Sequence, residues 1–442
     1  MPTQQKSVQK REVFGWVMYD FANSAFATTI LAVIFNQYFA TVVAGGEKGV
    51  ELFGVHLHGA SFFTFSVALS MALSACLSPF LGAIADASGS KKRFLMVFCY
   101  MGLVFTGLLY FVQEGRYWIG ACFFIIANIG FAAGNVFYNA FLPEITTPKN
   151  IGWISGLGWA WGYIGGGALL AINLIMLKYP EWLGFPQGTF TVQDCFLSVS
   201  VWWFIFSLPT FLFLKERSGE TVFVSRSDYF RTGYRRLAHT LRRIRSFKEL
   251  TKFLVAYLIY NDAIETVIVM ASIFGADVLG MKTDEIILFF LMVQGIAFIG
   301  SLVFGFLADA VGSKRTVMVS LIVWSVIVLW AFRLGIFWAP KTEYWILGGL
   351  VGMVLGGSQA ASRSLQGLLT PTANSAEFFA FYGISGKFAS VFGPLTYGVL
   401  IAITGSVQSG ILSVLLFFVV GMVLLWTVNE KKGMEEKEHP VL

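Results

Sequence analysis

Long apolar runs alternate with short polar segments along the whole chain. A membrane-spanning helix needs about 20 mostly apolar residues, and twelve runs approach or exceed that length. They lie at residues 14–43, 60–84, 94–112, 117–141, 153–177 and 196–214 and, after a polar stretch, at 250–278, 285–308, 314–335, 343–368, 376–403 and 408–428. The pattern predicts twelve transmembrane helices in two groups of six.

One short motif occurs once in each group of runs. The segments GAIADASGSKKR at 82–93 and GFLADAVGSKR at 305–315 share the spacing G-x-x-x-D-x-x-G-S-K, and each joins two apolar runs. The offset between Asp86 and Asp309 is 223 residues, as it is between Gly89 and Gly312. A repeat of about half the chain indicates two copies of one large unit rather than a solenoid.

The position of the motif suggests its chemistry. An aspartate at the end of a span can accept hydrogen bonds from the free amides of a neighbouring helix start, or pair with a basic residue. Gly89 and Gly312 suit a sharp reversal that needs a positive φ. The alternative is a generic charged turn, which is harder to reconcile with two copies in register. For Asp86, the ordered helix start near Asn374 is the expected partner.

Composition and charge place the chain in a membrane and orient it. Residues are 56% hydrophobic and 13% charged, whereas a soluble domain has roughly 25% charged residues. Most Lys and Arg residues lie in segments on one side, and the positive-inside rule makes that side cytoplasmic. Both termini should then face the cytoplasm of a cell (inner) membrane. The six outer basic residues are Lys48, Arg116, Lys178, Lys282, Arg333 and Lys341.

The predicted domains are an N-terminal six-helix half at 1–214, a cytoplasmic linker at 215–249, and a C-terminal six-helix half with a short charged tail at 250–442. Apolar residues in the linker fall at 230, 234, 237, 241 and 244, with arginines between them. This spacing predicts a basic amphipathic helix that binds anionic lipids of the inner leaflet. A solvated charged linker is the alternative.

Several polar residues lie inside the apolar runs, where a charge costs about 2.5–3.5 kcal/mol on insertion scales. They form short stripes at helical spacing and make candidate binding residues, although polar groups that satisfy one another between helices are the structural alternative. The candidates are Tyr19, Asp20 and Asn23 in the first span, Asn128 and Asn135 in the fourth, Tyr260, Asp262 and Glu265 in the seventh, Gln359 in the tenth, and Lys387 in the eleventh. Arg363 shares a helix face with Gln359.

The repeated motif resembles the signature of the major facilitator superfamily, which lies between the second and third spans and again between the eighth and ninth. Six further segments resemble the Atg22-like branch of that superfamily. They are GWVMYDFANSAF at 15–26, YNAFLPEI at 138–145, ISGLGWAWGYIGG at 154–166, LIYNDAIETV at 258–267, GGSQAASRS at 356–364 and EFFAFYGISGKFASVFGPL at 377–395. Two departures are Ala87 and Ala310, where the superfamily often has a basic residue, and Glu265, where an amide or another polar residue is expected.

The resemblance implies two pseudo-symmetric six-helix bundles, with spans one, four, seven and ten lining a central cavity. It also implies that the motif helps to close one conformational state, which gives gating roles to Asp86, Gly89, Arg93, Asp309, Gly312 and Arg315. The branch is named for vacuolar amino-acid effluxers of fungi. An amino acid or short peptide is therefore the expected substrate.

These observations predict a secondary transporter that works by alternating access. No G-x-x-x-x-G-K-[ST] nucleotide motif occurs, so the energy for transport must come from a gradient. Glu265, Asp262 or Asp20 would carry a coupling proton, or Lys387 would hold a substrate carboxylate while Asp262 or Glu265 holds an ammonium group. The alternatives are an exporter of amphiphilic or cationic compounds and a non-transporting receptor. We expect a monomer without catalytic activity, cofactor, metal or nucleic acid.

Overall fold

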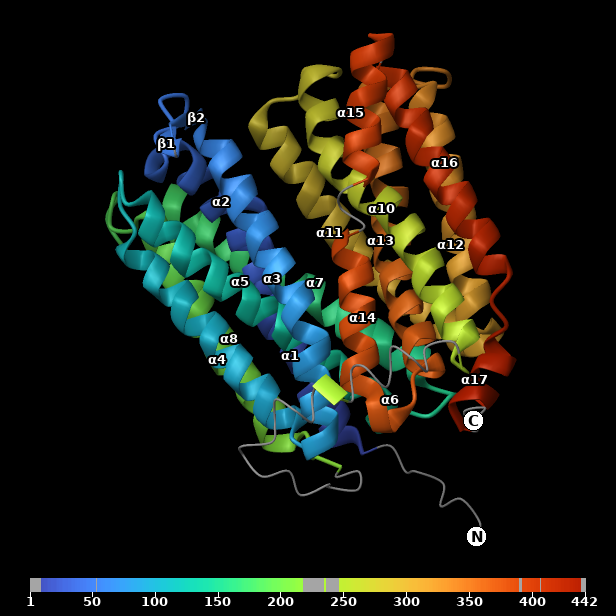
Figure 1. Cartoon of the computed structure of the whole chain (residues 1–442). Helices are drawn as coiled ribbons and strands as arrows, with labels where there is room; N and C mark the ends of the chain where they lie inside the picture. Colours follow the sequence, from blue (N-terminus) through green and yellow to red (C-terminus); the bar gives the residue numbers. More distant parts are fainter. Residues whose placement is uncertain are drawn as a thin grey trace. The chain divides into compact units, whose positions relative to one another are not determined.

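The computed structural model describes residues 9–52, 54–217, 234–235, 246–388, 392–405 and 407–438. Nearly all of its secondary structure is helical (Figure 1). In this described part, 11 helical segments are long and apolar enough to cross a membrane, or 12 if the bent pair Gly410–Trp426 and Glu430–Glu438 counts as one span. The prediction of an all-α integral membrane protein is confirmed. The predicted linker helix at 230–245 lies almost wholly outside the described residues.

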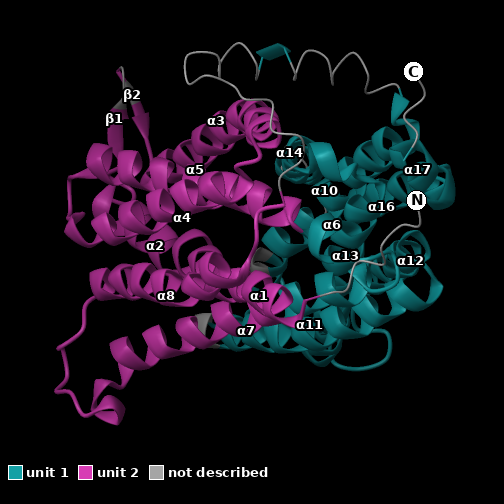
Figure 2. Ribbon diagram, turned by 90° about the horizontal axis from the view of Figure 1, so that it is seen from below, with its two compact units in different colours: residues 1–7, 142–160, 225–442 teal, residues 8–141, 161–224 magenta. Residues whose placement is uncertain are grey.

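The chain forms two compact units, coloured separately in Figure 2. Unit 1 comprises Met1–Ser7, Leu142–Ala160 and Ser225–Leu442, and unit 2 comprises Val8–Phe141 and Trp161–Val224. The segment Leu142–Ala160 thus groups with the C-terminal part of the chain, although it precedes the predicted linker. The division into halves at 1–214 and 250–442 stays a prediction.

Unit 2 contains the first spans and a small hairpin, and in it α4 packs on α5 and α8, α1 on α8, and α3 on α5. Its elements are α1 (Lys10–Ala25), the π-helix η1 (Phe26–Val33), α2 (Ile34–Tyr38), the π-helix η2 (Phe39–Val43), β1 (Val50–Leu52), β2 (Val55–Leu57), α3 (Gly59–Ser88), α4 (Lys91–Leu108), η3 (Leu109–Phe111), α5 (Tyr117–Ala140), η4 (Pro180–Leu183) and α8 (Val192–Phe213). The helix α7 (Ile151–Lys178) begins in unit 1 and continues into unit 2.

Unit 1 contains the remaining spans, and in it α11 packs on α13, α10 on α16 and α14, and α12 on α13 and α16. Its elements are α6 (Leu142–Ile145), α10 (Lys248–Asp277), α11 (Thr283–Val311), α12 (Ser313–Phe332), α13 (Pro340–Leu369), η7 (Thr372–Asn374), α14 (Ser375–Phe388), α15 (Phe392–Thr404), α16 (Val407–Trp426) and α17 (Glu430–Glu438). The predicted span 376–403 corresponds to α14 and α15, which lie on either side of the undescribed residues 389–391.

The first span is less regular than the predicted single helix at 14–43. Two π-helical segments, Phe26–Val33 and Phe39–Val43, interrupt its α-helical geometry. At the first of them, the Thr28 hydroxyl donates to the Ser24 carbonyl at 3.2 Å and to the Ala25 carbonyl at 3.3 Å. A threonine that bonds back to the preceding turn competes with backbone amides and can bend a helix. Apolar periodicity does not separate α- from π-geometry, so the sequence could not reveal this change.

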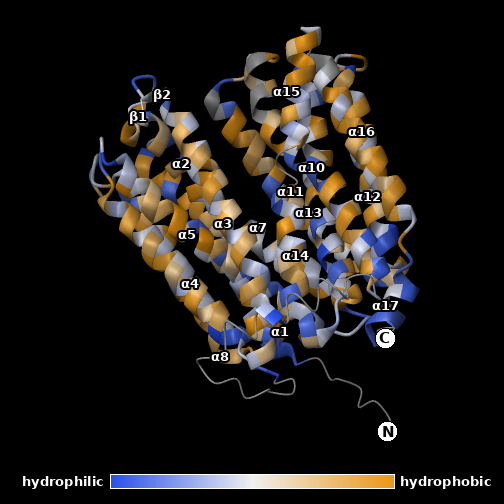
Figure 3. Cartoon of the chain, viewed as in Figure 1, coloured by the Kyte–Doolittle hydropathy of each residue, from blue (hydrophilic) through white to orange (hydrophobic). Residues whose placement is uncertain are grey.

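The helix surfaces match a lipid environment. Large apolar side chains such as Leu212 and Val423 are 74% and 62% exposed, and Figure 3 shows apolar colouring along most helices, with polar colouring at α17. Buried positions hold close contacts instead: a Cβ on Gly102 of α4 would lie 2.6 Å from the Trp203 ring of α8. Because lipid cannot drive apolar surfaces together, such small-residue contacts carry much of the packing.

Candidate functional site

The polar cluster predicted on the seventh span lies near the middle of α10. Helical spacing puts Asp262 and Glu265 one turn apart on this helix. The Tyr260 and Ser362 hydroxyl groups share a hydrogen bond of 2.7 Å between α10 and α13. The Asn261 amide donates to the Gly386 carbonyl of α14 at 3.4 Å. Hydrogen bonds therefore connect the cluster to α13 and to α14.

Asp262 is enclosed by protein. The residue is 1% exposed, and neither of its carboxylate oxygens has a hydrogen-bond partner among the described residues. The nearby Thr266 hydroxyl donates to the Asp262 backbone carbonyl at 2.6 Å rather than to the carboxylate. A Cβ on Gly393 would lie 3.0 Å from Asp262 Oδ1 and 2.0 Å from Thr266 Oγ1. The Gly393 segment of α15 thus lies against this carboxyl group.

Glu265 and Lys387 are more open than Asp262, since both are half-buried. The Asn261 side chain lies within hydrogen-bonding reach of the Glu265 carboxylate. Within the described part of the chain, no ion pair joins Lys387 to an acidic residue. The structure brings Asp262 and Glu265 together but does not place Lys387 in an ion pair with either one.

Aromatic side chains form a layer beside this cluster, on the side of the Lys248 end of α10. The rings of Tyr257 and Tyr382 stack with centroids 4.2 Å apart and an interplanar angle of 19°, and Tyr257 meets Tyr260 edge-on at 5.5 Å. Tyr382 lies on α14 and is 8% exposed. These three tyrosines bound the charged cluster on one side and add apolar surface with polar tips.

Arg363 on α13 holds the first turns of α7. This residue is 2% exposed, its Nη2 donates to the Ser155 carbonyl at 2.7 Å, and its Nε donates to Ser155 Oγ at 3.1 Å. The guanidinium also lies over the Trp159 ring, 5.0 Å from the centroid. Ser155 Oγ in turn donates to the Ala360 carbonyl at 2.7 Å. Gln359, which shares a helix face with Arg363, is half-buried.

The asparagine candidates in unit 2 have different hydrogen-bond partners. The Asn23 amide of α1 donates to the Asn135 amide oxygen of α5 at 2.6 Å. The Asn128 amide of α5 instead donates to Ser70 Oγ of α3 at 2.7 Å and is 1% exposed. The structure thus brings Asn23 and Asn135 together, whereas Asn128 faces a different helix.

Tyr19 and Asp20 are also buried in unit 2. The Tyr19 ring stacks on Tyr138 with centroids 4.9 Å apart, and Trp16 stacks on the same ring at 4.5 Å. A Cβ on Gly134 would lie 2.6 Å from the Tyr19 hydroxyl oxygen. Tyr19 is therefore part of a packed aromatic stack between α1 and α5.

The aspartates of both motif copies have close polar partners. Asp86 pairs with Lys91 at the start of α4, with 3.4 Å between Oδ1 and Nζ. Asp309 accepts hydrogen bonds from the Gly152 and Trp153 amides at the start of α7, at 2.7 and 2.8 Å. Both partner types were expected for such an aspartate. The expected contact of Asp86 with the helix start near Asn374 would join the two units and stays a prediction.

The glycines of the motif adopt the predicted backbone geometry. Gly89 has φ 57° and ends α3, and Gly312 has φ 100° and ends α11. Arg93 and Arg315 are exposed, and in the described part of the chain no ion pair involves either. The structure therefore gives contacts to the aspartates and lysines of the motif but not to its arginines.

Sequence reasoning missed a glutamate that follows the last span of each half. The Lys92 amide near the start of α4 donates to Glu216 at 3.0 Å, and Lys92 Nζ donates to the Leu214 carbonyl at 2.7 Å. In unit 1, the Lys314 amide near the start of α12 donates to Glu430 at 2.9 Å, and Lys314 Nζ donates to the Trp426 carbonyl at 2.8 Å. The sequence signal that could have revealed these contacts is a glutamate that closely follows the last span of each half.

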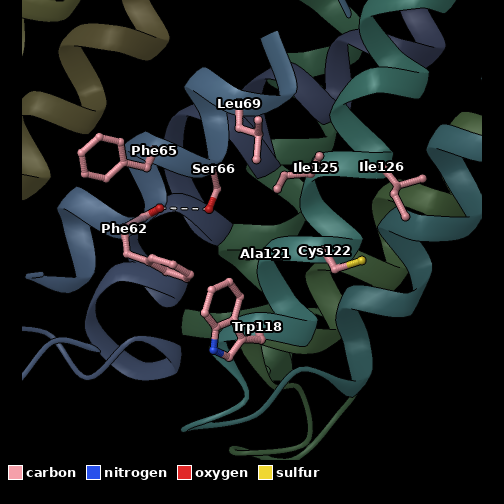
Figure 4. A pocket seen from close by; sticks show the side chains of 9 residues that line it. All are labelled: Phe62, Phe65, Ser66, Leu69, Trp118, Ala121, Cys122, Ile125 and Ile126. Atoms are coloured by element: carbon pink, nitrogen blue, oxygen red, sulfur yellow. Dashed lines mark hydrogen bonds between the residues drawn. The ribbon is translucent and has the colours of Figure 1, made fainter. Parts of the chain in front are cut away.

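A hollow of about 490 Å³ lies between α3 and α5 in unit 2 (Figure 4). The Ser66 hydroxyl on its wall donates to the Phe62 carbonyl at 2.9 Å. None of the predicted site residues lines the hollow, and its apolar wall suits a lipid-facing surface. The lining residues are Phe62, Phe65, Ser66, Leu69, Trp118, Ala121, Cys122, Ile125 and Ile126.

Comparisons with known proteins agree with this architecture. The family model described as "Vacuole effluxer Atg22 like" matches residues 8–438. The chain is 31% identical over 424 residues to the "Uncharacterized MFS-type transporter YxiO" of Bacillus subtilis (strain 168), covering 95% of each chain. It is 26% identical over 482 residues to autophagy-related protein 22 of Eremothecium gossypii, covering 98% of this chain and 93% of the relative.

Solved structures show the same fold at low sequence identity. The proton:xylose symporter XylE superposes with a TM-score of 0.71 at 13% identity, over 97% of this chain and 98% of that chain. A bacterial homologue of the iron transporter ferroportin gives a TM-score of 0.68 at 14% identity, over 95% and 98%. The predicted major facilitator fold is thus confirmed, and the chain belongs to the Atg22-like family of major facilitator superfamily transporters.

Proposed function

We propose that this protein is a secondary transporter that moves an amino acid or a short peptide across a cell membrane by gradient-driven alternating access. The observation that carries the proposal is Asp262, a carboxyl group enclosed mid-span on α10 without a hydrogen-bond partner among the described residues. An ionisable residue in that position is costly and has a functional reason by default. The description of the matching family model, a vacuole effluxer, supports the transport of a solute, and the amino-acid substrate is our proposal.

The charges around Asp262 fit a zwitterion. Half-buried Glu265 presents a carboxylate that suits an ammonium group, and half-buried Lys387 presents an ammonium without an ion-pair partner among the described residues. Two opposite charges that do not neutralise each other are available for a ligand of both signs. Tyr260 and Gln359, in the same unit, would add polar contacts.

The coupling ion in this proposal is the proton. A carboxyl group enclosed by protein can bind and release a proton without leaving a permanent charge in the membrane interior. Glu265, Asp262 and Asp20 are the candidate carriers, and all three lie inside predicted spans.

Gating would involve the two motif copies. Asp309 accepts two amides from the start of α7, and a helix start has a partial positive charge that favours such an anion. Breaking this contact, together with that of Arg363, would free the beginning of α7. We also propose that both termini are cytoplasmic, that the basic linker binds anionic lipids, and that the protein acts as a monomer.

The experiment is transport into liposomes that contain the purified full-length protein. A panel of radiolabelled amino acids is offered with and without an imposed pH gradient. Saturable uptake that the gradient raises above equilibrium supports the proposal, and absence of any saturable flux supports the receptor alternative. Flux of lipophilic cations, but not of amino acids, would favour the exporter, for which the tyrosines beside Glu265 offer a cation-binding surface.

A further inference from the structure

The buried acidic residues of unit 1 differ in the hydrogen bonds that their carboxylates accept. Glu343 on α13 is 0% exposed and accepts four hydrogen bonds, from the Trp330 side chain and from the backbone amides of Gly335, Phe337 and Trp338. Glu249 is 1% exposed and accepts from the Lys252 side chain and from the Asn429 amide. Burial of a carboxylate in this fold is thus normally accompanied by donors.

Asp262 departs from this rule. It is as enclosed as Glu249, yet within the described residues it alone has two carboxylate oxygens that are both buried and without a hydrogen bond. The hydroxyl that could serve it, Thr266 Oγ1, already donates to the Asp262 carbonyl. A buried carboxylate with so few hydrogen-bond donors is disfavoured in its ionised form. Such an environment favours a bound proton.

The surrounding helices supply little compensating charge. On α16, which packs along α10, residues 407–426 include no ionisable side chain. Lys387 is the one lysine or arginine on α14 and α15, and it forms no ion pair with Asp262. The other ionisable side chains in the middle of the helices packed on α10 are Tyr257, Tyr260 and Glu265 on α10 itself, Tyr382 on α14, Arg363 on α13 and Tyr397 on α15.

We infer that Asp262 is the proton-binding site of the transport cycle, and that Glu265 is a substrate-binding group instead. The proton forms an O–H bond with one carboxylate oxygen when it arrives, and that bond breaks when it leaves. Glu265 is half-buried and near the Asn261 amide, so its carboxylate can face a ligand. The proposed function leaves open which of these two acids binds the proton and which binds the substrate. In this inference Asp262 binds the proton and Glu265 binds the substrate.

Proton release would also involve α15. Gly393 lies on α15, and its backbone approaches the Asp262 carboxyl group. The Gly393 backbone amide is close enough to the carboxylate to stabilise its ionised form. Proton release is in this way linked to the segment of the eleventh span that carries Gly393. This consequence rests on the proposed function.

The test needs no substrate. Infrared spectra of the purified full-length protein in lipid are recorded across a pH titration, with unlabelled aspartate and with aspartate carrying ¹³C in its side-chain carboxyl. We expect a protonated-carboxyl band at neutral pH that shifts with the label, disappears in Asp262→Asn and persists in Glu265→Gln. Labelling in the unmodified protein keeps the test valid if Asp262→Asn fails to fold.

Three results would overturn the inference. The first is a neutral-pH band that does not shift with labelled aspartate, and the second is a band lost only in Glu265→Gln. The third is a band that sodium chloride removes and choline chloride does not, which would make Asp262 a sodium site. Failure of the proposed function is seen separately. If the band behaves as expected but the amino-acid panel shows no flux, Asp262 still binds a proton and the substrate proposal is wrong.

Discussion

The Asp309 carboxylate accepts a hydrogen bond from the Gly152 amide at 2.7 Å, and so joins the end of α11 to the first residues of α7. The equivalent residue of the first repeat, Asp86 near the end of α3, pairs with Lys91 at the start of α4. The second copy of the motif thus makes a long-range contact through its aspartate, and the aspartate of the first copy takes part in an ion pair with a lysine of the same motif.

Removing the charge at Asp309 should loosen the start of α7. In Asp309→Asn the amide retains one acceptor, but its NH₂ group faces backbone donors and the interaction with the helix dipole is lost. A cost of about 1–2 kcal/mol would change the population of the contact roughly 5- to 30-fold. Reaction of a single cysteine at position 153 in a cysteine-free variant with a soluble maleimide should become correspondingly faster. Arg333→Gln, which removes a charge at an exposed residue outside the motif, should leave the rate unchanged.

Arg363 should not be replaceable by lysine. The guanidinium donates through two nitrogen atoms to Ser155 and covers Trp159, whereas an ammonium has no planar fork. We expect Arg363→Lys to destabilise the protein by about 1–3 kcal/mol, seen as a lower midpoint of thermal unfolding in detergent. Arg333→Lys, at an exposed position, is the matched control. Equal midpoints for the two variants would show that the Arg363 contacts contribute little.

Gly393 should tolerate no side chain. Its Cβ would lie 2.0 Å from Thr266 Oγ1 and 3.0 Å from Asp262 Oδ1, whereas nothing lies within 4 Å of the corresponding position at Gly398 on the same helix. Gly393→Ala should therefore destabilise the protein by roughly 1–3 kcal/mol through overpacking, and Gly398→Ala should not. Thermal unfolding compares the two alanine variants directly. A normal midpoint for Gly393→Ala would mean that α15 does not press on Asp262.

Lys387→Ala distinguishes a ligand from a structural counter-ion. Because no described acidic residue pairs with Lys387, its removal should leave stability unchanged and weaken binding of substrates that have a carboxylate. The change in half-saturating concentration is measured for an amino acid and for its amide. A variant that loses affinity equally for both, or that unfolds, would argue against a carboxylate-binding role.

Much of the fold could be predicted from the sequence. The twelve apolar runs, the repeated motif and the positive φ of Gly89 and Gly312 depend on local patterns, and helix ends such as Gly59 and Phe213 lie within a few residues of the predicted ones. The hairpin that pairs Val50 with Leu57 and the polar helix α17 were not predicted, because both are short and lie outside the apolar runs. Tertiary context stabilises them.

The candidate site was less accessible to sequence reasoning. Polar residues inside spans were visible as a pattern, but the pattern could not say that Asn128 donates to Ser70 whereas Asn135 accepts from Asn23. It also could not distinguish enclosed Asp262 from half-buried Glu265, which are three residues apart. Partner choice depends on helices far apart in the sequence, and helical periodicity carries no information about them.

Topology follows from the asymmetry of basic residues and can be tested with two cysteines. In a cysteine-free variant, a cysteine at Gln187 should react with an impermeant maleimide added to intact cells, because that segment is predicted to face outward. A cysteine at Ser227, in the basic linker, should react only after the membrane is opened. Labelling of position 227 from outside would invert the proposed orientation.

The central claim is that gradient energy enters through Asp262, and a single pair of flux measurements on Asp262→Asn addresses it. Liposomes with this variant are compared with unmodified protein for accumulation of radiolabelled amino acids under a pH gradient and for exchange of the same amino acids without one. The account predicts that accumulation is lost while exchange continues, since exchange does not require the carboxyl group to cycle its proton. Accumulation at the unmodified level would contradict the account.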